Sequence, residues 1–349
     1  SHTCTEEDYT CSSPIDSDPD SPASSTKRGR RRLRHTPPTP NSTHRLILQR
    51  IPAEHTQESW QREMAARRKR QQDVFPRQVL KQMDLSVDGN DVEIGKEVGH
   101  GAASIVYSGY WCGTKVAIKR ILRSLDKTQA LNASFVQETL LMSKLRHPNV
   151  LQLFAASVSN DCYLVVTEYC ARGSLSDILS QRSVHLSYAL KKRIATHTAR
   201  GMYYLHTKSP PIIHRDLKST NLLVTKNWTV KVADFGLSTV LDETRAEMTM
   251  CGTITHTAPE VLRGDNSYTT KADVYSYGIV LWQLFTNEKI YQGMKLLEIA
   301  NAVSDCEKQL RPRLPHPKIP SEFQSIIAQC WQHEPDDRPS FDTILALLE

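Results

Sequence analysis

A carboxylate, a lysine and an amide stand close together in this chain and form its clearest candidate for chemistry. They occur in the segment His214-Arg215-Asp216-Leu217-Lys218-Ser219-Thr220-Asn221, which an apolar run at 222–224 follows. The lysine comes two residues after the carboxylate of Asp216, and the amide comes five residues after it. These three side chains can converge on one site, where they would present an anionic, a cationic and a neutral polar group.

A second acidic residue, Asp234, follows an expected strand at 229–233 and begins the tripeptide Asp234-Phe235-Gly236. An aspartate at a strand end beside a glycine can reach outward to a metal ion, and carboxylate oxygens suit a hard divalent cation. A single tripeptide can arise by coincidence, but its order and spacing after the Asp216 segment are difficult to reproduce by chance.

Lys119 ends the mostly apolar stretch Val116-Ala117-Ile118-Lys119, which is typical of a strand. A lysine in an otherwise buried strand costs free energy unless it is paired. Glu138, on the next expected helix, is the natural partner. An exposed lysine on an edge strand is the alternative that these residues leave open.

The segment Gly99-His100-Gly101-Ala102-Ala103-Ser104-Ile105-Val106 lies at an expected strand–turn–strand. Glycine lets a backbone approach a ligand closely and take up unusual φ angles. The amides of this segment could therefore lie over phosphate groups. A glycine-containing hairpin without a ligand is the alternative, because this signal is weak by itself.

The composition changes near residue 85 and divides the chain into a tail and a globular part. Residues 1–26 are rich in Ser, Thr, Pro and Asp, and the block 27–34 holds six basic residues among eight. Such a segment cannot bury enough apolar surface to offset its chain entropy. We therefore predict a disordered regulatory tail at 1–85, with a short basic helix within 57–83.

From about residue 91 the pattern is that of a globular domain, with β-branched runs first and helical spacing later. The expected strands are 92–98, 104–110, 115–121, 151–156, 163–169 and 229–233, and the expected helices are 132–145, 187–206, 272–285, 295–304, 321–332 and 339–349. This order predicts an α+β fold with two lobes, a small N-lobe at about 92–170 and a helical C-lobe at about 171–349.

Taken together, these motifs resemble the signature of the eukaryotic protein kinases. The resemblance covers about 92–349 and includes Ala258-Pro259-Glu260, Asp273 in Lys271-Ala272-Asp273-Val274, and Arg338 in Asp337-Arg338-Pro339. It implies a bilobal catalytic domain at 86–349. Segments such as Phe135-Val136-Gln137-Glu138 and Leu145-Arg146-His147-Pro148-Asn149 are similar to the tyrosine-kinase-like group, which contains Raf-like and mixed-lineage-like enzymes.

The resemblance implies transfer of the γ-phosphoryl group of ATP to a hydroxyl of a protein substrate. Asp216 would orient the substrate hydroxyl and accept its proton, and Lys218 would face the γ-phosphate. Lys119, oriented by Glu138, would hold the α- and β-phosphates.

Residues for the nucleotide and the metal follow from the same resemblance. Asp234 and Asn221 would hold the metal, Mg²⁺ or alternatively Mn²⁺. Gly99 and Gly101 would cover the phosphates. The adenine would be surrounded by Val106, Ala117 and Leu223, beside the hinge residues Glu168 and Cys170. Thr167 falls at the gatekeeper position, where a small side chain implies a back pocket open to bulky inhibitors.

Another group of residues has structural roles in this resemblance. Met142, Leu153, His214 and Phe235 resemble the stack of side chains that joins the lobes, with Asp273 at its base. Glu260 and Arg338 resemble a buried ion pair, and loss of one partner from such a pair costs about 3–5 kcal/mol.

Lys218 and Thr253 favour serine and threonine over tyrosine as the phosphorylated residue, because both are typical of serine/threonine kinases. Dual specificity stays open. His256 and Thr257 stand where the group usually has an aromatic residue and methionine, which leaves the preference for the following substrate residue open.

The activation segment implied by the resemblance runs from Asp234 to Glu260. We predict that an upstream kinase phosphorylates Thr249, or alternatively Thr244, and that the phosphate pairs with Arg215. Solvated threonines without a regulatory role are the alternative.

Composition bears on the remaining function classes. No apolar run reaches the roughly 18 residues of a membrane span, and the eight cysteines form no metal-ligand spacing. Reduced thiols favour a cytoplasmic or nuclear protein, and the block 27–34 could be a nuclear signal, a lipid contact or a solvated tail. The net charge of +6 gives no strong nucleic-acid signal. An inactive kinase-like scaffold, and nucleic-acid binding through the basic arm, are the competing functions.

Overall fold

The computed structural model describes residues 78, 80–82, 85–88, 91–100, 104–122, 130–159, 161–181, 183–236, 238–240, 253–265 and 269–349. All of them belong to one unit of the chain, Gln61–Glu349. The block 27–34, Gly101, Thr244, Thr249 and most of the helix predicted within 57–83 lie outside the described residues.

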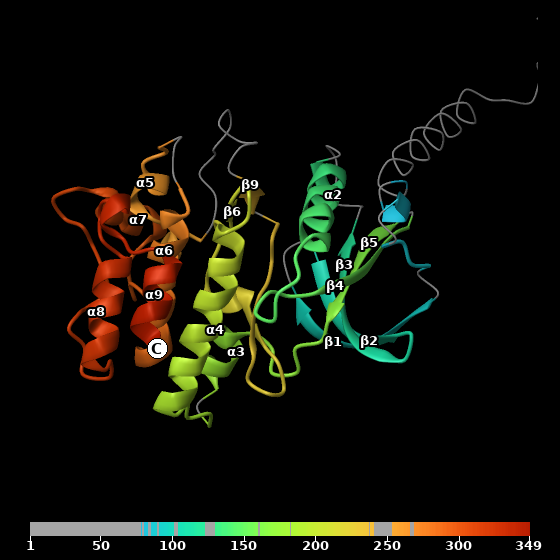
Figure 1. Ribbon diagram of the computed structural model, residues 1–349, viewed down its shortest axis with the longest axis horizontal. Coiled ribbons are helices and arrows are strands. Elements are labelled where there is room, and N and C mark those ends of the chain that lie inside the picture. Colours follow the sequence, from blue (N-terminus) through green and yellow to red (C-terminus); the bar gives the residue numbers. More distant parts are fainter. Residues whose placement is uncertain are drawn as a thin grey trace, which may run out of the picture. The chain divides into compact units, whose positions relative to one another are not determined.

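The N-lobe is built on a five-stranded antiparallel sheet (Figure 1). Its strands are β1 (Val92–His100), β2 (Ser104–Trp111), β3 (Thr114–Leu122), β4 (Leu153–Val158) and β5 (Cys162–Glu168), in the order β1-β2-β3-β5-β4. Lys119 pairs with Val106 of β2 on one side and with Val165 of β5 on the other. Because β3 is the central strand, its backbone is held on both edges.

Side chains on β3 alternate between the two faces of the sheet. Val116 and Ile118 belong to one apolar cluster, whereas Ile121 belongs to a larger one that also holds Phe135 and Met142 of helix α2 (Ala130–Ser143). This helix packs against β4. Helix α2 therefore covers the face of the sheet on which Lys119, two residues from Ile121, also lies.

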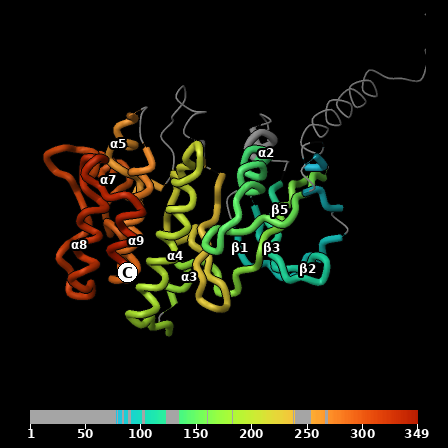
Figure 2. The backbone as a smooth tube through the Cα atoms, viewed as in Figure 1, coloured from blue at the N-terminus to red at the C-terminus, as the bar shows by residue number. Residues whose placement is uncertain are grey.

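The second lobe is mainly helical, as the yellow-green to red part of the tube in Figure 2 shows. Its helices are α3 (Leu175–Ser180), α4 (Tyr188–His206), α5 (Pro259–Leu262), α6 (Lys271–Thr286), α7 (Leu296–Ser304), α8 (Ser321–Cys330) and α9 (Phe341–Leu348). Helix α6 is buried along almost its whole length and contacts α4 and α8. None of the helices in the described ranges has the length and apolar character needed to cross a membrane.

Short strands frame the loop that carries Asp216. Strand β7 (Leu222–Val224) pairs with β8 (Val230–Val232), and β6 (Ile212–Ile213) pairs with β9 (Thr239–Val240). Asp216 thus follows β6, and Asp234 follows β8. The two strand pairs therefore anchor the backbone just before Asp216 and just before Asp234.

The predicted α+β fold with two lobes is confirmed, and the long elements lie within a few residues of their predicted bounds. The unpredicted elements are short: α3, α5, β6 and β9 have between two and six residues. Helix α3 depends on a local cap, because the Ser174 hydroxyl accepts from the Asp177 N–H and the Asp177 carboxylate accepts from the Ser174 N–H.

The packed part of the chain begins upstream of residue 86, where the predicted tail ends. Leu80 and Leu85 are 3% and 7% exposed and belong to the same apolar cluster as α2. Their environment was not evident in the sequence because two leucines in a polar segment form no periodic pattern.

Candidate active site

The sheet register brings the expected nucleotide residues of three strands onto one face. Val106 lies opposite Lys119, and Ala117 lies opposite Thr167. Directly paired residues in an antiparallel sheet share a face, and so do residues two apart on one strand. Val106, Ala117, Lys119 and Thr167 therefore all lie on the side of the sheet that α2 covers.

Lys119 is positioned between two carboxylates. Its Nζ lies 3.4 Å from Glu138 Oε1 on α2 and 3.6 Å from Asp234 Oδ1. Burial by itself would lower the pKa of Lys119, but the two carboxylates outweigh it and the net shift is upward. The lysine is thus a fixed positive charge that connects β3, α2 and the Asp234 segment.

The predicted carboxylate, lysine and amide do converge. The Lys218 Nζ lies 2.6 Å from Asp216 Oδ2. Asn221 Nδ2 donates to the Asp216 carbonyl at 2.8 Å and to Asp216 Oδ2 at 3.1 Å. Asp216 is only 8% exposed, so these donors compensate for lost water.

Thr253 connects the end of the activation segment to this group. Its N–H and its hydroxyl donate to Asp216 Oδ1 at 3.1 and 3.0 Å. Its hydroxyl oxygen also accepts a hydrogen bond of 2.7 Å from Lys218. Each oxygen of the Asp216 carboxylate therefore has two polar contacts, Oδ1 with Thr253 and Oδ2 with Lys218 and Asn221, which together fix its orientation.

A buried aspartate holds the backbone of the loop that carries Asp216. Asp273 of α6 is fully buried and accepts from the N–H groups of His214 and Arg215, both at 2.9 Å, and it lies 2.8 Å from His206 Nε2. Burial would raise the pKa of Asp273, but the contacts with His206 and His214 outweigh it and lower the pKa. Arg215 has a φ of 66°, a strained value that these bonds maintain.

Asp234 and Asn221 fit the requirements of a divalent cation shared with phosphates. Asp234 has a half-exposed side chain at 49% and a φ of 66°, so its carboxylate stands out from the end of β8. Asn221 donates through its amide nitrogen to Asp216, and its amide oxygen accepts one long bond of 3.4 Å from the Thr220 hydroxyl, which leaves a second lone pair for a metal. No group of three or more potential metal ligands gathers in the described ranges. Mg²⁺ is usually bound by one or two protein oxygens, with phosphate and water oxygens as its other ligands. Asp234 and Asn221 would supply the protein oxygens.

The residues expected around adenine are apolar but only partly buried. Val106, Ala117 and Leu223 are all of intermediate exposure, and Leu223 forms an isolated bridge with Ser174. Gly99 pairs with Val106, and a methyl group added at Gly99 would meet Val106 at an ordinary 3.6 Å. Packing within the protein therefore does not require glycine at 99, which is consistent with a close approach to a ligand.

The side chains of the expected hinge are engaged with the protein. Glu168 lies 2.7 Å from Lys231 Nζ and accepts from the Gln152 N–H at 2.8 Å. Burial, followed by the charge of Glu168, raises the pKa of the Cys170 thiol to about 12. Both side chains are thus structural, and contacts with adenine would come from the backbone of these residues.

The residues expected to join the lobes are buried together. Met142, Leu153, His214 and Phe235 are each at most 2% exposed. The rings of His214 and Phe235 lie 5.4 Å apart between centroids. Below them, Arg338 and Glu260 form a bidentate pair with bonds of 2.7 and 2.8 Å.

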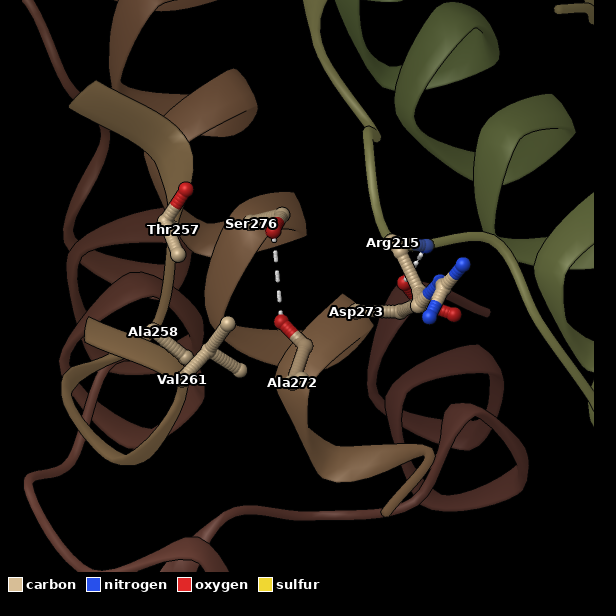
Figure 3. A pocket seen from close by; sticks show the side chains of 7 residues that line it. All are labelled: Arg215, Thr257, Ala258, Val261, Ala272, Asp273 and Ser276. Atoms are coloured by element: carbon tan, nitrogen blue, oxygen red, sulfur yellow. Dashed lines mark hydrogen bonds between the residues drawn. The ribbon is translucent and has the colours of Figure 1, made fainter. Parts of the chain in front are cut away.

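A small pocket lies beside Arg215 rather than at the expected phosphate-binding residues. Figure 3 shows Arg215 and Asp273 on one side of it and Thr257, Ala258 and Val261 on the other. The Ser276 hydroxyl lies within hydrogen-bond distance of two carbonyl oxygens, that of His256 at 2.8 Å and that of Ala272 at 3.2 Å, the second of which Figure 3 marks. The pocket thus separates Arg215 from the segment around Ala258-Pro259-Glu260.

The structure adds partners that the sequence did not indicate. His206 and Lys231, which contact Asp273 and Glu168, stand outside the motifs, and no spacing rule connects them with their partners. Only the fold brings them together.

Comparison with known proteins agrees with this geometry. Residues 92–348 match the family described as protein tyrosine and serine/threonine kinase. The chain belongs to this family.

Relatives similar to this domain are named as kinases. The chain is 41% identical over 273 residues to the probable serine/threonine-protein kinase drkD of Dictyostelium discoideum, which covers 78% of this chain and 21% of that protein. It is 42% identical over 267 residues to drkC of the same organism, with 75% and 35% covered. A putative serine/threonine-protein kinase/receptor, R826 of Acanthamoeba polyphaga mimivirus, is 35% identical over 263 residues, with 75% and 15% covered. The chain therefore spans well under half the length of these relatives.

Proposed function

We propose that this protein transfers the γ-phosphoryl group of ATP to serine and threonine residues of protein substrates. The observation that carries the proposal is the set of bonds from Thr253 to both Asp216 and Lys218. Lys218 and Thr253 favour a serine or threonine acceptor, and the two Dictyostelium relatives are named as probable serine/threonine-protein kinases. The motifs also support membership of the tyrosine-kinase-like group.

The residues divide the reaction between them. Asp216 orients the substrate hydroxyl and accepts its proton, because Thr253, Lys218 and Asn221 fix its carboxylate. Lys218 adds positive charge where the transferred group passes, and catalysis of phosphoryl transfer depends mainly on such positioning and charge. Lys119, held by Glu138, binds the α- and β-phosphates of ATP.

The cofactors proposed are ATP and Mg²⁺, with Mn²⁺ as the alternative. Asp234 and Asn221 supply the protein ligands, and the metal would neutralise phosphate charge. The partners proposed are protein substrates and an upstream kinase that phosphorylates Thr249 or Thr244. The location proposed is the cytoplasm, with the nucleus as the alternative through the block 27–34.

The decisive experiment is a kinase reaction of the full chain with MgATP on degenerate peptides that carry serine, threonine or tyrosine as the acceptor. We expect phosphate on serine and threonine peptides, and none above background with Asp216→Asn. This change keeps the shape of the side chain, so the variant should retain the thermal midpoint of the wild type.

The same experiment separates the competing functions. Equal background rates for wild type and Asp216→Asn would support an inactive scaffold, and comparable rates on tyrosine peptides would support dual specificity. A separate binding measurement tests the third competing function, nucleic-acid binding through the basic arm. Salt-dependent binding by the full chain that is lost when 27–34 is deleted would support it.

A further inference from the structure

Three apolar residues upstream of the kinase family match are buried in the N-lobe. Leu80, Leu85 and Val87 are 3%, 7% and 9% exposed, whereas the match begins at residue 92. A leucine buried to this degree belongs to the core rather than to a tail. These residues therefore have a role that the family signature does not include.

The backbone of this segment completes the edge of the sheet. The Ala156 N–H donates to the Leu85 carbonyl at 2.9 Å, and the Val87 N–H donates to the Ala156 carbonyl at 3.2 Å. Ser86 and Ala156 form a parallel bridge. Since β4 is the outer strand in the order β1-β2-β3-β5-β4, the segment covers an edge that would otherwise be open.

The side chains of the segment reach both faces of the sheet. Val87 belongs to the cluster with Val116 and Ile118, on the face away from α2. Leu80 and Leu85 belong to the larger cluster, which extends through both lobes and whose N-lobe part includes Phe135, Val136 and Met142 of α2. The Leu85 N–H also donates to the Leu80 carbonyl at 3.0 Å, which ties the two leucines to each other.

Helix α2 carries Glu138, whose Oε1 lies 3.4 Å from Lys119 Nζ. This helix packs against β4, the strand whose edge the segment completes. The segment that holds Leu80 and Leu85 therefore supports α2, and with it Glu138, through β4, to which both the segment and the helix are attached. Removing apolar volume there allows α2 to shift, and a shift of about 1 Å is enough to break a charge-assisted hydrogen bond.

We propose that Leu80 and Leu85 are positioning residues for phosphoryl transfer, which hold α2 where Glu138 reaches Lys119. This role rests on the proposed function. The catalytic unit then begins near residue 80 rather than at residue 92, where the family match starts.

The experiment measures phosphorylation rate and ATP-induced thermal stabilisation on full-length Leu80→Ala and Leu85→Ala proteins, below their thermal midpoints. We expect kcat to fall at least about fivefold, a factor at the lower end of measured couplings between sites. The Michaelis constant for ATP should rise. Leu80→Met keeps the side-chain volume, so its kcat and Michaelis constant should stay close to those of the wild type.

Two control variants separate positioning from general loss of stability. Leu297→Ala makes the same change at a side chain 72% exposed on α7 and should alter nothing. Leu348→Ala truncates a leucine that is 3% exposed on α9. It should lower the thermal midpoint while kcat stays as in the wild type. A fall in kcat for Leu348→Ala equal to that for Leu80→Ala would overturn the proposal.

A double-mutant cycle tests the route through Glu138. In a Glu138→Gln background, Leu80→Ala should cause little further loss of rate, because the bond that it weakens is already altered. Additive losses would contradict the proposal.

The outcomes also distinguish the two proposals. A wild-type protein that MgATP stabilises but that transfers no phosphate would overturn the proposed function alone. Equal rate and equal stabilisation in wild type and Leu80→Ala would overturn the positioning role alone.

Discussion

Thr253 is the residue through which the end of the activation segment contacts the catalytic loop. Its hydroxyl accepts from Lys218 and donates to Asp216, so one side chain orients both the proposed base and the proposed cation. Both contacts are charge-assisted, which makes them stronger than bonds between neutral groups.

Replacing Thr253 tests this arrangement. Thr253→Ala removes the hydroxyl while the N–H bond to Asp216 stays, and we expect kcat to fall by about 10²-fold, a typical effect of losing one positioning group. Thr253→Ser keeps the hydroxyl and should stay within about threefold of the wild type, because the same hydrogen bonds can form. Steady-state kinetics on a serine peptide give the comparison. Equal kcat values for the two variants would remove Thr253 from the mechanism.

His256 is a buried imidazole near the end of the activation segment. It is 7% exposed, its Nδ1 lies 3.0 Å from the Thr255 hydroxyl, and within the described part of the chain its Nε2 has no hydrogen-bond partner. Burial lowers the pKa of His256 to about 4, with Asp216 opposing the shift and Lys218 adding to it. The imidazole is therefore neutral in the folded protein at neutral pH.

This pKa predicts a loss of stability in mild acid. Unfolding lets His256 take up a proton at about pH 6.5, so its contribution is fully present above that pH and is lost as the pH falls toward 4. Over this window the free energy of unfolding should fall by on the order of 3 kcal/mol more in the wild type than in His256→Gln. Denaturant unfolding at pH 7 and pH 4.5 measures the difference. The exposed His185→Gln control should retain the wild-type slope, and a His256→Gln protein with that slope would contradict the pKa shift.

At the scale of elements, α4 approaches strand β8 and the neighbouring Asn149 closely at Gly201. A methyl group there would lie 2.6 Å from the Asn149 carbonyl oxygen and 2.9 Å from Val232 Cγ2. Asn149 has little freedom to move, because its carbonyl accepts from the Val232 N–H at 2.9 Å and its Nδ2 donates to the Val230 carbonyl at 3.0 Å.

Gly201→Ala should therefore destabilise the protein although alanine favours helix by about 1 kcal/mol. We expect a net loss of about 1–3 kcal/mol, the usual cost of overpacking, because the methyl group would meet a backbone carbonyl. Arg200→Ala changes the neighbouring exposed residue on α4 and should stay within about 0.5 kcal/mol of the wild type. Chemical denaturation measures both. A Gly201→Ala variant more stable than the wild type would show that α4 can move away from β8.

The sequence predicted the long elements because their apolar residues repeat with the period of a helix or a strand. Helix α3 and helix α5 have six and four residues, too few for a period to be seen. Lys119, Glu138, Asp216 and Asn221 were predicted as site residues because motif order identified them. The burial of Leu80 in the core and the contact of Lys231 with Glu168 could not be predicted, since both depend on segments that only the tertiary fold brings together.

At the scale of the whole molecule, the two lobes share a few charged contacts at the proposed ATP site. The bond from Lys119 to Asp234 joins β3 of the N-lobe to the segment after β8. A nucleotide that bridges Lys119 and a metal on Asp234 would add contacts to both lobes. Binding only to the folded state stabilises that state by mass action.

MgATP should therefore raise the thermal midpoint of the full chain. At a concentration of about 100 times its dissociation constant, the ligand adds about 2.7 kcal/mol, which for a domain of this size corresponds to about 5 °C or more. Differential scanning fluorimetry should show the rise with MgATP and its loss when EDTA removes the metal. Asp234→Asn should abolish the metal-dependent part of the rise in thermal midpoint, because it removes the charged ligand.

Asp342→Asn, at an exposed position in the first turn of α9, is the matched control and should keep the full rise in thermal midpoint. A full shift in Asp234→Asn would mean that the metal is bound through the nucleotide and other residues, and that Asp234 serves mainly to orient Lys119.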